Sequence, residues 1–241
     1  MLSAEKLSLA GRLDGVSAAL EIGKVTAICG PNGAGKSTLL SCLAGTELPQ
    51  AGRVMLGQDD LNRLPARIRG KRLGYLPQAP EIAWDIAAKA LVRLGRLPHR
   101  DRGDAAVERA IAALDLEALR HRPASQLSGG ERARVLLARV LAGEPEWILA
   151  DEPLAALDLA HQISLLRMLR ARADAGTGVV MVVHDLSLAM NHADRVIVLD
   201  RGRVVADGQP EDALSPENLR AVWQVEARWL GEAHARALTV S

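Results

Sequence analysis

One stretch decides the fold of this chain: Gly30-Pro31-Asn32-Gly33-Ala34-Gly35-Lys36-Ser37-Thr38. The apolar residues 25–29 precede it and have the composition of a buried parallel strand. Residues 39–44 follow it and begin a helix. A strand, a glycine-rich loop and a helix in this order form the structural context of a phosphate-binding loop. The stretch therefore predicts a site for a nucleoside triphosphate at the start of a helix.

The residue types of the stretch match the parts of a bound triphosphate. Three positions are glycine: Gly30, Gly33 and Gly35. Because they carry no side chain, backbone amides can approach the phosphate oxygens, next to the partial positive charge of the helix start. Lys36 is expected to reach the β- and γ-phosphates, and the Ser37 hydroxyl to bind Mg²⁺. The Thr38 hydroxyl is expected near the α- or β-phosphate.

The composition is that of a globular protein. The chain has 241 residues, which suffices for one large α/β domain with a substantial core. Phe is absent, so Leu, Ile, Val and Ala must fill that core. Cys29 and Cys42 lack metal-ligand spacing and are expected to pack there as thiols.

Charge and hydropathy exclude several classes of protein. A formal net charge of +1 without a dense basic run argues against direct binding of nucleic acid. No apolar stretch is long enough to span a bilayer, and the first residues lack a signal-peptide pattern. We therefore expect a soluble, cytoplasmic chain.

The predicted secondary structure changes from mainly strands to helices after residue 78. Short strands are predicted at residues 7–9, 16–20, 52–57 and 73–78. The first three suggest a small antiparallel sheet, and the fourth ends at Pro77 and Gln78. Apolar residues then recur at helical spacing over 82–94 and 104–119. These two helices predict an inserted helical subdomain.

Two later strands end in chemistry-bearing side chains. Residues 147–150 form a buried strand that is followed by Asp151 and Glu152, and the apolar strand 179–183 is followed by His184. Ligands of open α/β sheets bind at the carboxyl ends of the strands, where the phosphate loop also lies. The three side chains are therefore expected to converge on the triphosphate. Each alone is commonly structural, but their order and spacing favour one site.

The rest of the chain is predicted to complete the core. A helix is expected from the segment Gln126-Leu127-Ser128-Gly129-Gly130-Glu131 to about residue 141, and another over 160–173. Residues 196–199 and 204–206 predict a hairpin. A helical tail is expected from Pro210 onward, with Trp223 and Trp229 packed on the core.

The segment Leu127-Ser128-Gly129-Gly130-Glu131 resembles the signature of ABC-type ATPases, roughly ninety residues after the phosphate loop. The resemblance covers essentially the whole chain. It implies ATP and Mg²⁺ as cofactors and a single nucleotide-binding domain over 1–241. The implied fold is an α/β P-loop NTPase of ABC type, with a mainly parallel sheet, an antiparallel β subdomain and an inserted α-helical subdomain. The implied parts are an ATP-binding core (1–78 and 145–214), a helical subdomain with the signature (79–144) and a C-terminal helical tail (215–241).

The same resemblance implies the roles of the residues at the strand ends. Asp151 is expected to hold Mg²⁺ through water, and Glu152 to act as general base on the attacking water. Gln78 is expected to touch Mg²⁺ and that water while sensing the helical subdomain. His184 is expected to contact the γ-phosphate from the opposite side.

A second copy of the chain is also implied. Ser128, Gly129 and Gly130 are expected to bind the γ-phosphate of ATP held by the other copy, in a head-to-tail dimer with two sandwiched nucleotides. Asp158 is expected to cross that interface.

The sequence departs from the family pattern in two places. The family usually stacks an aromatic near its N-terminus on adenine, but no aromatic precedes Tyr75 here. We expect the guanidinium of Arg12 to stack on the base instead. Leu154-Ala155 stands where the family usually has small hydroxylic residues, so a hydrogen bond across the dimer is expected to be missing.

Four further segments are similar to stretches in the ATPases of ferric siderophore, haem and cobalamin importers: Leu94-Gly95-Arg96-Leu97-Pro98-His99, Leu157-Asp158-Leu159-Ala160-His161-Gln162, Asn191-His192-Ala193-Asp194-Arg195 and Pro216-Glu217-Asn218-Leu219-Arg220-Ala221-Val222-Trp223. This similarity implies a metal-chelate importer with integral-membrane permease subunits and a periplasmic or extracellular substrate-binding protein. The chain would lie at the cytoplasmic face of the cell membrane, with the permease seated near residues 78–100. Trp84 lines the docking groove or packs inside the insert; the sequence favours neither.

A soluble ATPase of a protein-assembly complex, such as iron-sulfur cluster assembly, is the alternative function. The phosphate loop, the signature and the acidic pair would do the same work there. The similarity to importer segments favours transport.

Overall fold

The phosphate loop follows the strand at the centre of the main sheet. In the computed structural model, which describes residues 1–78, 82 and 85–240, β3 (Val25–Cys29) is fully buried. Its neighbours are β9 (Arg195–Asp200) and β8 (Gly178–Val182), both parallel to it. The six-stranded sheet has the order β10 (Arg203–Gly208), β9, β3, β8, β7 (Trp147–Asp151) and β6 (Leu73–Leu76), and all pairs are parallel except β10 with β9. Such a sheet buries both faces, which explains the uninterrupted apolar runs of β3, β7 and β8.

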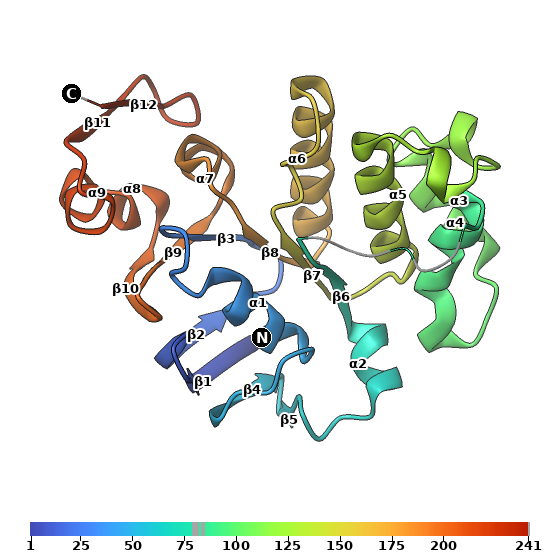
Figure 1. Cartoon of the computed structure of the whole chain (residues 1–241), viewed down its shortest axis with the longest axis horizontal. Coiled ribbons are helices and arrows are strands. Elements are labelled where there is room, and N and C mark those ends of the chain that lie inside the picture. The colour runs from blue at the N-terminus through green and yellow to red at the C-terminus, as the bar shows by residue number, and fades with distance from the viewer. Residues whose placement is uncertain (79–81, 83–84, 241) are drawn as a thin grey trace.

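The remaining elements surround this sheet (Figure 1). The strands within the described residues are β1 (Leu2–Leu9), β2 (Leu13–Leu20), β4 (Ala51–Leu56), β5 (Asp59–Asp60), β11 (Ala227–Leu230) and β12 (Ala237–Val240), beside those already named. The α-helices are α1 (Lys36–Ala44), α2 (Ala66–Arg72), α3 (Ala88–Arg93), α4 (Asp104–Ala112), α5 (Gly129–Ala142), α6 (Leu159–Asp174), α7 (Leu186–His192), α8 (Pro210–Ala213) and α9 (Pro216–Trp223). Short 3₁₀ helices cover Leu94–His99, Glu117–Leu119 and Ala124–Gln126.

Two apolar clusters form the core, one on each face of the main sheet. Alternate residues of β3 divide between them: Val25, Ala27 and Cys29 belong to the cluster with α5, α6 and α7, whereas Ile28 belongs to the cluster with α1 and the antiparallel sheet. That second sheet has the order β2-β1-β4-β5, as the short apolar runs predicted. The phosphate-loop helix α1 is therefore held between the two sheets.

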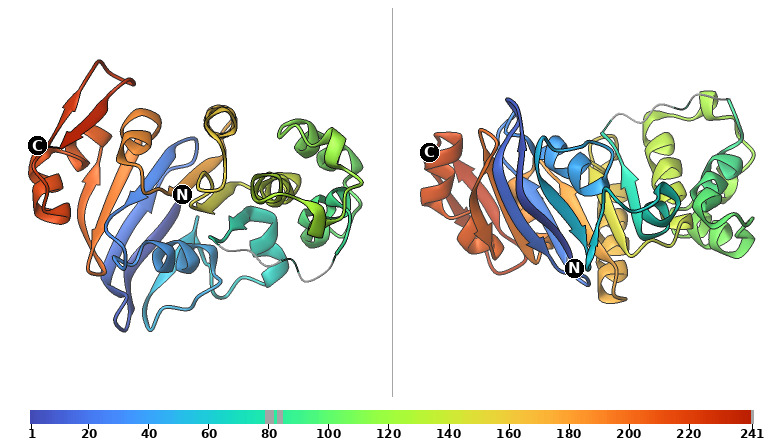
Figure 2. Two further views of the ribbon diagram at one scale, coloured as in Figure 1. Left: turned by 45° about the horizontal axis from the view of Figure 1, so that its top comes forward. Right: turned by 90° about the horizontal axis from the view of Figure 1, so that it is seen from below.

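The helical subdomain lies apart from the C-terminal elements, at opposite ends of the molecule (Figure 2). It consists of α3, α4, α5 and the 3₁₀ helices, packed through contacts of α5 with α3 and α4. The segment 94–99 closes the end of α5: Arg96 donates to Ala142 O at 3.2 Å, and a ring nitrogen of His99 lies 3.0 Å from Gly143 O. The two carboxylate oxygens of Asp101 also accept from Nε and Nη2 of Arg96. This importer-like segment thus has a structural role, because it bonds to carbonyl groups at the C-terminal end of α5.

Both helices expected before α5 are shorter than the periodicity predicted. Residues 86 and 88 pair in extended form with the segment 122–124, through Ala124 N to Ile86 O and Ala88 N to Arg122 O, each 2.9 Å, so α3 begins only at Ala88. The helix expected over 104–119 ends at Ala112, close to Asp115, whose φ is 52°. Long-range pairing and a left-handed residue override the local apolar pattern here. Trp84 lies outside the described residues.

The expected helical tail is partly a hairpin. Helix α9 ends at Trp223, because Gln224 takes the left-handed conformation with φ 58°. Strands β11 and β12 then pair with each other. Trp229 donates its indole N–H to Leu214 O at 2.8 Å and packs, like Trp223, against the core. The prediction that both tryptophans pack on the core is confirmed, while the all-helical tail was wrong because the hairpin is held by such tertiary contacts.

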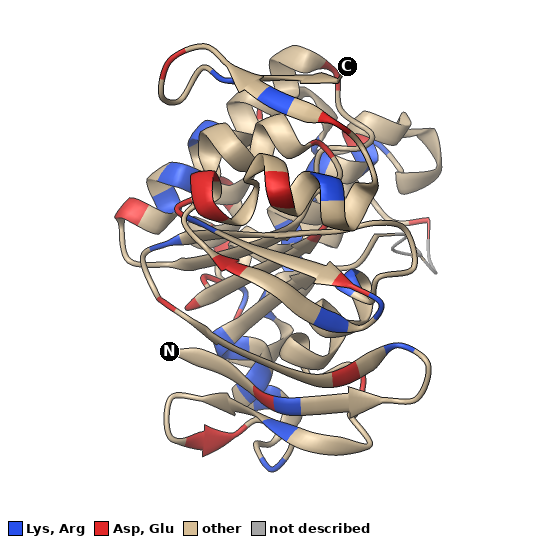
Figure 3. Cartoon of the chain, turned by 90° about the vertical axis from the view of Figure 1, so that its left-hand side faces the viewer, with Lys and Arg blue, Asp and Glu red and all other residues tan. Residues whose placement is uncertain are grey.

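The surface carries mixed charge. On the face in Figure 3, Lys and Arg alternate with Asp and Glu over the strands and helices, in line with the formal net charge of +1. Among the described residues, no helix combines the length and the apolar character needed to cross a membrane.

Candidate active site

The order of strands brings the predicted residues to one edge of the sheet. Strands β3, β8, β7 and β6 are neighbours in that order, and all run in the same direction. Their carboxyl ends are followed by the phosphate loop, His184, Asp151 with Glu152, and Gln78. Segments that are distant in sequence therefore face one space.

The phosphate loop needs glycine at two positions for reasons inside this chain. Gly30 has φ 146°, and a Cβ there would lie 2.1 Å from Leu199 O. Gly35 has φ 100°, and a Cβ there would lie 2.5 Å from Arg12 O. Side chains are excluded both by the backbone conformation and by neighbouring carbonyls. The sequence prediction that these glycines permit a close backbone approach agrees with this geometry.

Lys36 is folded back onto its own loop. Its side chain is 6% exposed and donates to Gly30 O at 2.8 Å and to Pro31 O at 2.9 Å. Burial lowers the pKa of Lys36, opposed by the charges of Glu152 and Asp151. The carbonyl oxygens hold the ammonium at the mouth of the loop, where a phosphate oxygen can replace them.

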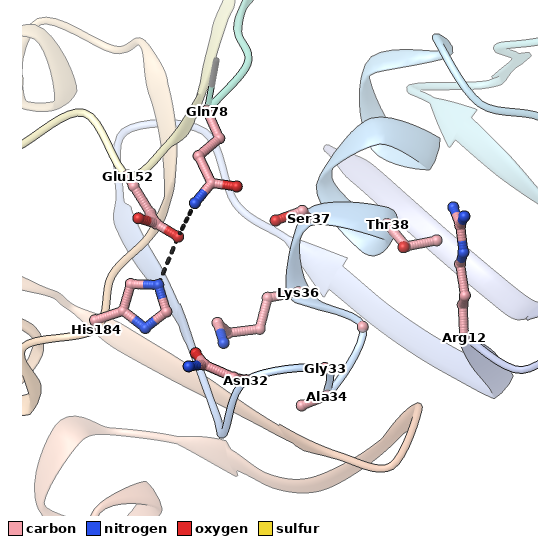
Figure 4. A pocket seen from close by; sticks show the side chains of 11 residues that line it. Arg12, Asn32, Gly33, Ala34, Lys36, Ser37, Thr38, Gln78, Glu152 and His184 are labelled. Atoms are coloured by element: carbon pink, nitrogen blue, oxygen red, sulfur yellow. Dashed lines mark hydrogen bonds and ion pairs between the residues drawn. The ribbon is translucent and has the colours of Figure 1, made fainter. Parts of the chain in front are cut away.

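A cavity of about 620 Å³ opens in front of the loop (Figure 4), a volume typical of ligand sites. The residues that line it are Arg12, Asn32, Gly33, Ala34, Gly35, Lys36, Ser37, Thr38, Gln78, Glu152 and His184. Gly30 and Asp151 are buried beneath this lining. Most of the residues predicted to bind nucleotide thus surround one cavity.

Glu152 is the meeting point of the three later strands. Gln78 donates its amide to Glu152 Oε1 at 2.7 Å, and a ring nitrogen of His184 shares a hydrogen bond of 2.5 Å with the same oxygen (Figure 4). Glu152 also has φ 52°, an uncommon conformation for a residue with a side chain. Strain of this kind persists where the surroundings enforce it, and it often marks functional sites.

Asp151 and Ser37 offer oxygen donors suited to Mg²⁺. Asp151 is 3% exposed, and its Oδ1 is buried without a hydrogen-bond partner among the described atoms. Burial raises the pKa of Asp151, whereas a hydrogen bond with Ser37 opposes the rise. The described residues contain no group of three His, Cys, Asp or Glu side chains placed to hold a metal. A hydroxyl and a single carboxylate, with phosphate oxygens and water completing the shell, fit Mg²⁺.

Arg12 lies at the rim of the cavity, beyond Thr38 as seen from Glu152 and His184 (Figure 4). Its guanidinium donates to Glu47 Oε1 at 3.0 Å, and its side chain is 60% exposed. The sequence did not point to Glu47, since only the fold brings residues 12 and 47 together.

A second unexpected link ties α1 to β6. The hydroxyls of Ser41 and Tyr75 lie 3.0 Å apart. Tyr75 precedes Gln78 on the same strand and loop, and Ser41 lies one turn after Ser37 on α1.

The signature residues do not reach this cavity. The lining just given includes none of residues 128–131. Ser128 caps α5 by accepting from Glu131 N, and the Glu131 carboxylate accepts from Ser128 N at 2.8 Å. A Cβ at Gly129 would meet no described atom within 4 Å. In a single chain the predicted contact of the signature with ATP is therefore not formed.

Asp158 is the N-cap residue of helix α6. Its Oδ1 accepts from His161 N at 2.9 Å and lies 2.8 Å from the Nδ1 of the same ring. The hydrogen bond from the His161 backbone lowers the pKa of Asp158. The segment 157–162 thus has a structural role in this chain, because it caps the N-terminal end of α6.

The comparisons with known proteins agree with this geometry. A family model described as ABC transporter matches residues 13–155. The chain is 46% identical over 216 residues to the hemin import ATP-binding protein HmuV of Rhodococcus jostii (strain RHA1), covering 88% of this chain and 74% of that protein. It is 43% identical over 238 residues to HmuV of Pseudomonas aeruginosa, covering 94% of this chain and 93% of that protein.

Solved structures extend the likeness to the fold. An ABC transporter assigned to the metal-chelate type, in an inward-facing conformation, has TM-score 0.81 and 26% identity, covering 100% of this chain and 96% of that one. A dimeric, post-hydrolysis state of the ATP-binding cassette MJ0796 bound to ADP and Pi has TM-score 0.75 and 28% identity, covering 87% and 99%. The predicted α/β fold of ABC type is confirmed. The chain belongs to the ABC transporter family, as an ATP-binding subunit with ATPase activity.

Proposed function

We propose that this chain hydrolyses ATP to power the import of a metal chelate through a separate membrane permease. The observation that carries the proposal is the 43% identity, over 94% of the chain, to a protein named for hemin import. Haem is therefore the favoured cargo within the class that also contains siderophore-iron and cobalamin. The cargo would not touch this subunit, since its cavity is built for a triphosphate.

Within the cavity we assign one task to each group. The amides of residues 30–38 and the ammonium of Lys36 hold the phosphates. Ser37, Asp151 and Gln78 hold Mg²⁺ directly or through water, and the ion neutralises phosphate charge when bound. Glu152 orients and deprotonates the attacking water, and His184 contacts the γ-phosphate. Arg12 stacks on adenine, with Glu47 steadying its guanidinium.

A second copy completes the site in this proposal. Ser128, Gly129 and Gly130 bind the γ-phosphate held by the other copy, and Asp158 lies in the contact between the two. Support comes from the open space around Gly129 and from the dimeric cassette among the structural relatives. ATP binding would close the dimer, and hydrolysis would open it.

The helical subdomain is the proposed link to the permease. We divide the chain into an ATP-binding core (1–78 and 145–214), a helical subdomain (79–144) and a C-terminal region (215–241). A cytoplasmic segment of the permease would dock near residues 78–100 and move with the subdomain, at the cytoplasmic face of the membrane. A periplasmic or extracellular substrate-binding protein would deliver the chelate.

Co-purification tests the transport role. Tagged Glu152→Gln protein, which is expected to trap ATP with little turnover, is captured with ATP from detergent-solubilised membranes of its own cell. A polytopic permease as the main partner is expected. Soluble assembly proteins alone would overturn the transport role and favour the alternative, an ATPase of protein assembly. Undiminished hydrolysis by Glu152→Gln would refute the general base.

The cargo is tested with the permease that this capture identifies. The wild-type subunit and its permease are reconstituted in liposomes with the substrate-binding protein. ATP hydrolysis is then measured with haem, a ferric siderophore or cobalamin. Stimulation by haem alone is expected, and stimulation by another chelate would reassign the cargo within the class.

A further inference from the structure

One short loop contacts both halves of the catalytic arrangement. It consists of residues 153–157, between Glu152 and the start of α6 at Asp158. In its middle, Ala156 O lies so close to the signature helix that a Cβ on Gly130 would be 3.1 Å away. The loop therefore connects the carboxylate of the chain's own cavity with the beginning of α5.

The loop has little regular structure to hold its shape. Its internal backbone bonds are Ala155 N to Glu152 O at 3.3 Å and Leu157 N to Leu154 O at 3.1 Å. The apolar side chains of Leu154 and Leu157 anchor it in the core, at 5% and 9% exposure. Leu154 and Ala155 bring no side-chain hydrogen bond of their own. Within the loop, Leu154 O accepts only from Leu157 N, which leaves its second lone pair and the Leu157 carbonyl for partners outside the loop.

Gln162, on the first turn of α6, supplies that partner. Its Nε2 donates to Leu154 O and to Leu157 O, each at 3.1 Å. Both hydrogen atoms of one amide are thus used to hold two carbonyls of the same loop. The preceding residue, His161, fixes the end of the loop through Asp158. Gln162 also lines a smaller cavity of about 180 Å³ together with Glu152 and His184.

We propose that Gln162 is a positioning residue for ATP hydrolysis. By holding residues 154–157 in one shape, it fixes the distance between Glu152, which acts in the chain's own cavity, and α5, which acts in the partner's cavity. The proposal rests on the two-copy arrangement proposed above. A loop free to change shape would let the two ends move independently, so that the general base would lose its alignment when the dimer closes.

Two substitutions test the role. Gln162→Glu keeps the size of the side chain but turns a carboxylate toward two carbonyl oxygens, and Gln162→Ala removes the amide. For both we expect kcat to fall about tenfold, with the KM for ATP changed less than about twofold, because alignment is lost while nucleotide contacts remain. Arg167→Gln is the control, since it makes the same change of charge on an exposed position of α6.

The outcomes separate the two proposals. Unchanged kcat in both Gln162 variants, beside the expected loss in Glu152→Gln, overturns the positioning role and leaves the proposed function intact. Undiminished hydrolysis in Glu152→Gln refutes the general-base role assigned under the proposed function, and the positioning role of Gln162 falls with it. A fall in kcat that parallels a fall in Tm, and disappears at lower temperature, shows a purely structural glutamine and also overturns the positioning role.

Discussion

The starts of α1 and α5 both contain glycines, but they differ in what surrounds those glycines. Both follow small residues and both were predicted to bind phosphate. The loop before α1 is shaped by its own chain, since Gly30 packs against Leu199 O and Gly35 against Arg12 O. At the start of α5, Gly129 faces open space among the described residues. The first start is shaped within the chain, whereas the second is left open. Under the proposed function, a second copy covers it.

Capping shows the same contrast. Helix α1 has Gly35 at its cap position, with no side-chain hydrogen bond there, so the first amides of α1 remain available to a ligand. Helix α5 begins with a complete capping box formed by Ser128 and Glu131. It is stable without any ligand. The comparison teaches that the first helix start keeps its amides free for a ligand, whereas the second is complete within the chain. Under the proposed function, only closure of a dimer brings a nucleotide to the second start.

The largest expected effect is on ATP turnover, when a variant of the phosphate loop is mixed with a variant of the signature. Lys36→Ala and Ser128→Arg should each lower ATP turnover by about 10²-fold or more, the first by losing the phosphate contact and the second by blocking the signature. Mixed in equal amounts, they should recover roughly a quarter of wild-type turnover, because half of the dimers then carry one intact composite site. Steady-state ATPase assays on the mixture measure this. No recovery above either variant alone would mean that the phosphate loop and the signature of one and the same chain act on one ATP.

Alanine substitutions at Gly30 and Gly129 compare the two helix starts by their effect on the free energy of unfolding. Gly30→Ala should lower the free energy of unfolding by about 3 kcal/mol or more, because its Cβ meets a carbonyl and its φ is left-handed. Gly129→Ala should change it by less than about 1 kcal/mol but still reduce ATP-driven dimerisation. Urea unfolding and light scattering with ATP measure the two effects. Equal destabilisation by both would contradict the contrast.

Substitutions at Arg12 test whether the nucleotide site in front of α1 extends to the rim of the cavity. Arg12→Ala should weaken ATP binding about three- to tenfold, through loss of a stacking contact at an exposed rim. Glu47→Gln should have a smaller effect in the same direction, since an exposed ion pair contributes little. Isothermal titration with ATP on the Glu152→Gln background measures both. ATP affinity left unchanged by Arg12→Ala would remove Arg12 from the adenine site.

The last prediction concerns how stability depends on pH through the two cysteines beside the phosphate loop. Burial raises the pKa of Cys29 to about 12 and that of Cys42 to about 11, from 9.0. The folded protein therefore holds these thiol protons more tightly than the unfolded chain does. The resulting contribution to the free energy of unfolding is fully present below pH 9 and is lost as pH rises toward 12. Unfolding measured by urea from pH 8 to 11 should show declining stability, with a shallower decline in Cys29→Ala. Thiol labelling that is slow in native protein at pH 8 would agree, and rapid labelling would show an open loop.

The strand–loop–helix signal, the acidic pair at the end of β7 and His184 after β8 were predictable because each depends on neighbours within a few residues. Strands β3, β7 and β8 were expected almost at their observed bounds, since a doubly buried strand is an apolar run. The helices around residues 82–119 and the tail were less predictable. Extended pairing of residues 86–88 and the left-handed Asp115 and Gln224 depend on contacts that no periodicity contains.

The sequence by itself determined which groups can act: the phosphate loop, Asp151 with Glu152, Gln78, His184 and the signature. The tertiary structure alone decided how they meet. Gln78 and His184 both bond Glu152 because β6, β7 and β8 are neighbours in the sheet, and the order of strands is not a local property. It also decided that Glu47 faces Arg12 and that Gln162 holds the loop after Glu152. Side-chain chemistry is fixed residue by residue, whereas distances between remote residues follow from how the whole chain buries its apolar surface.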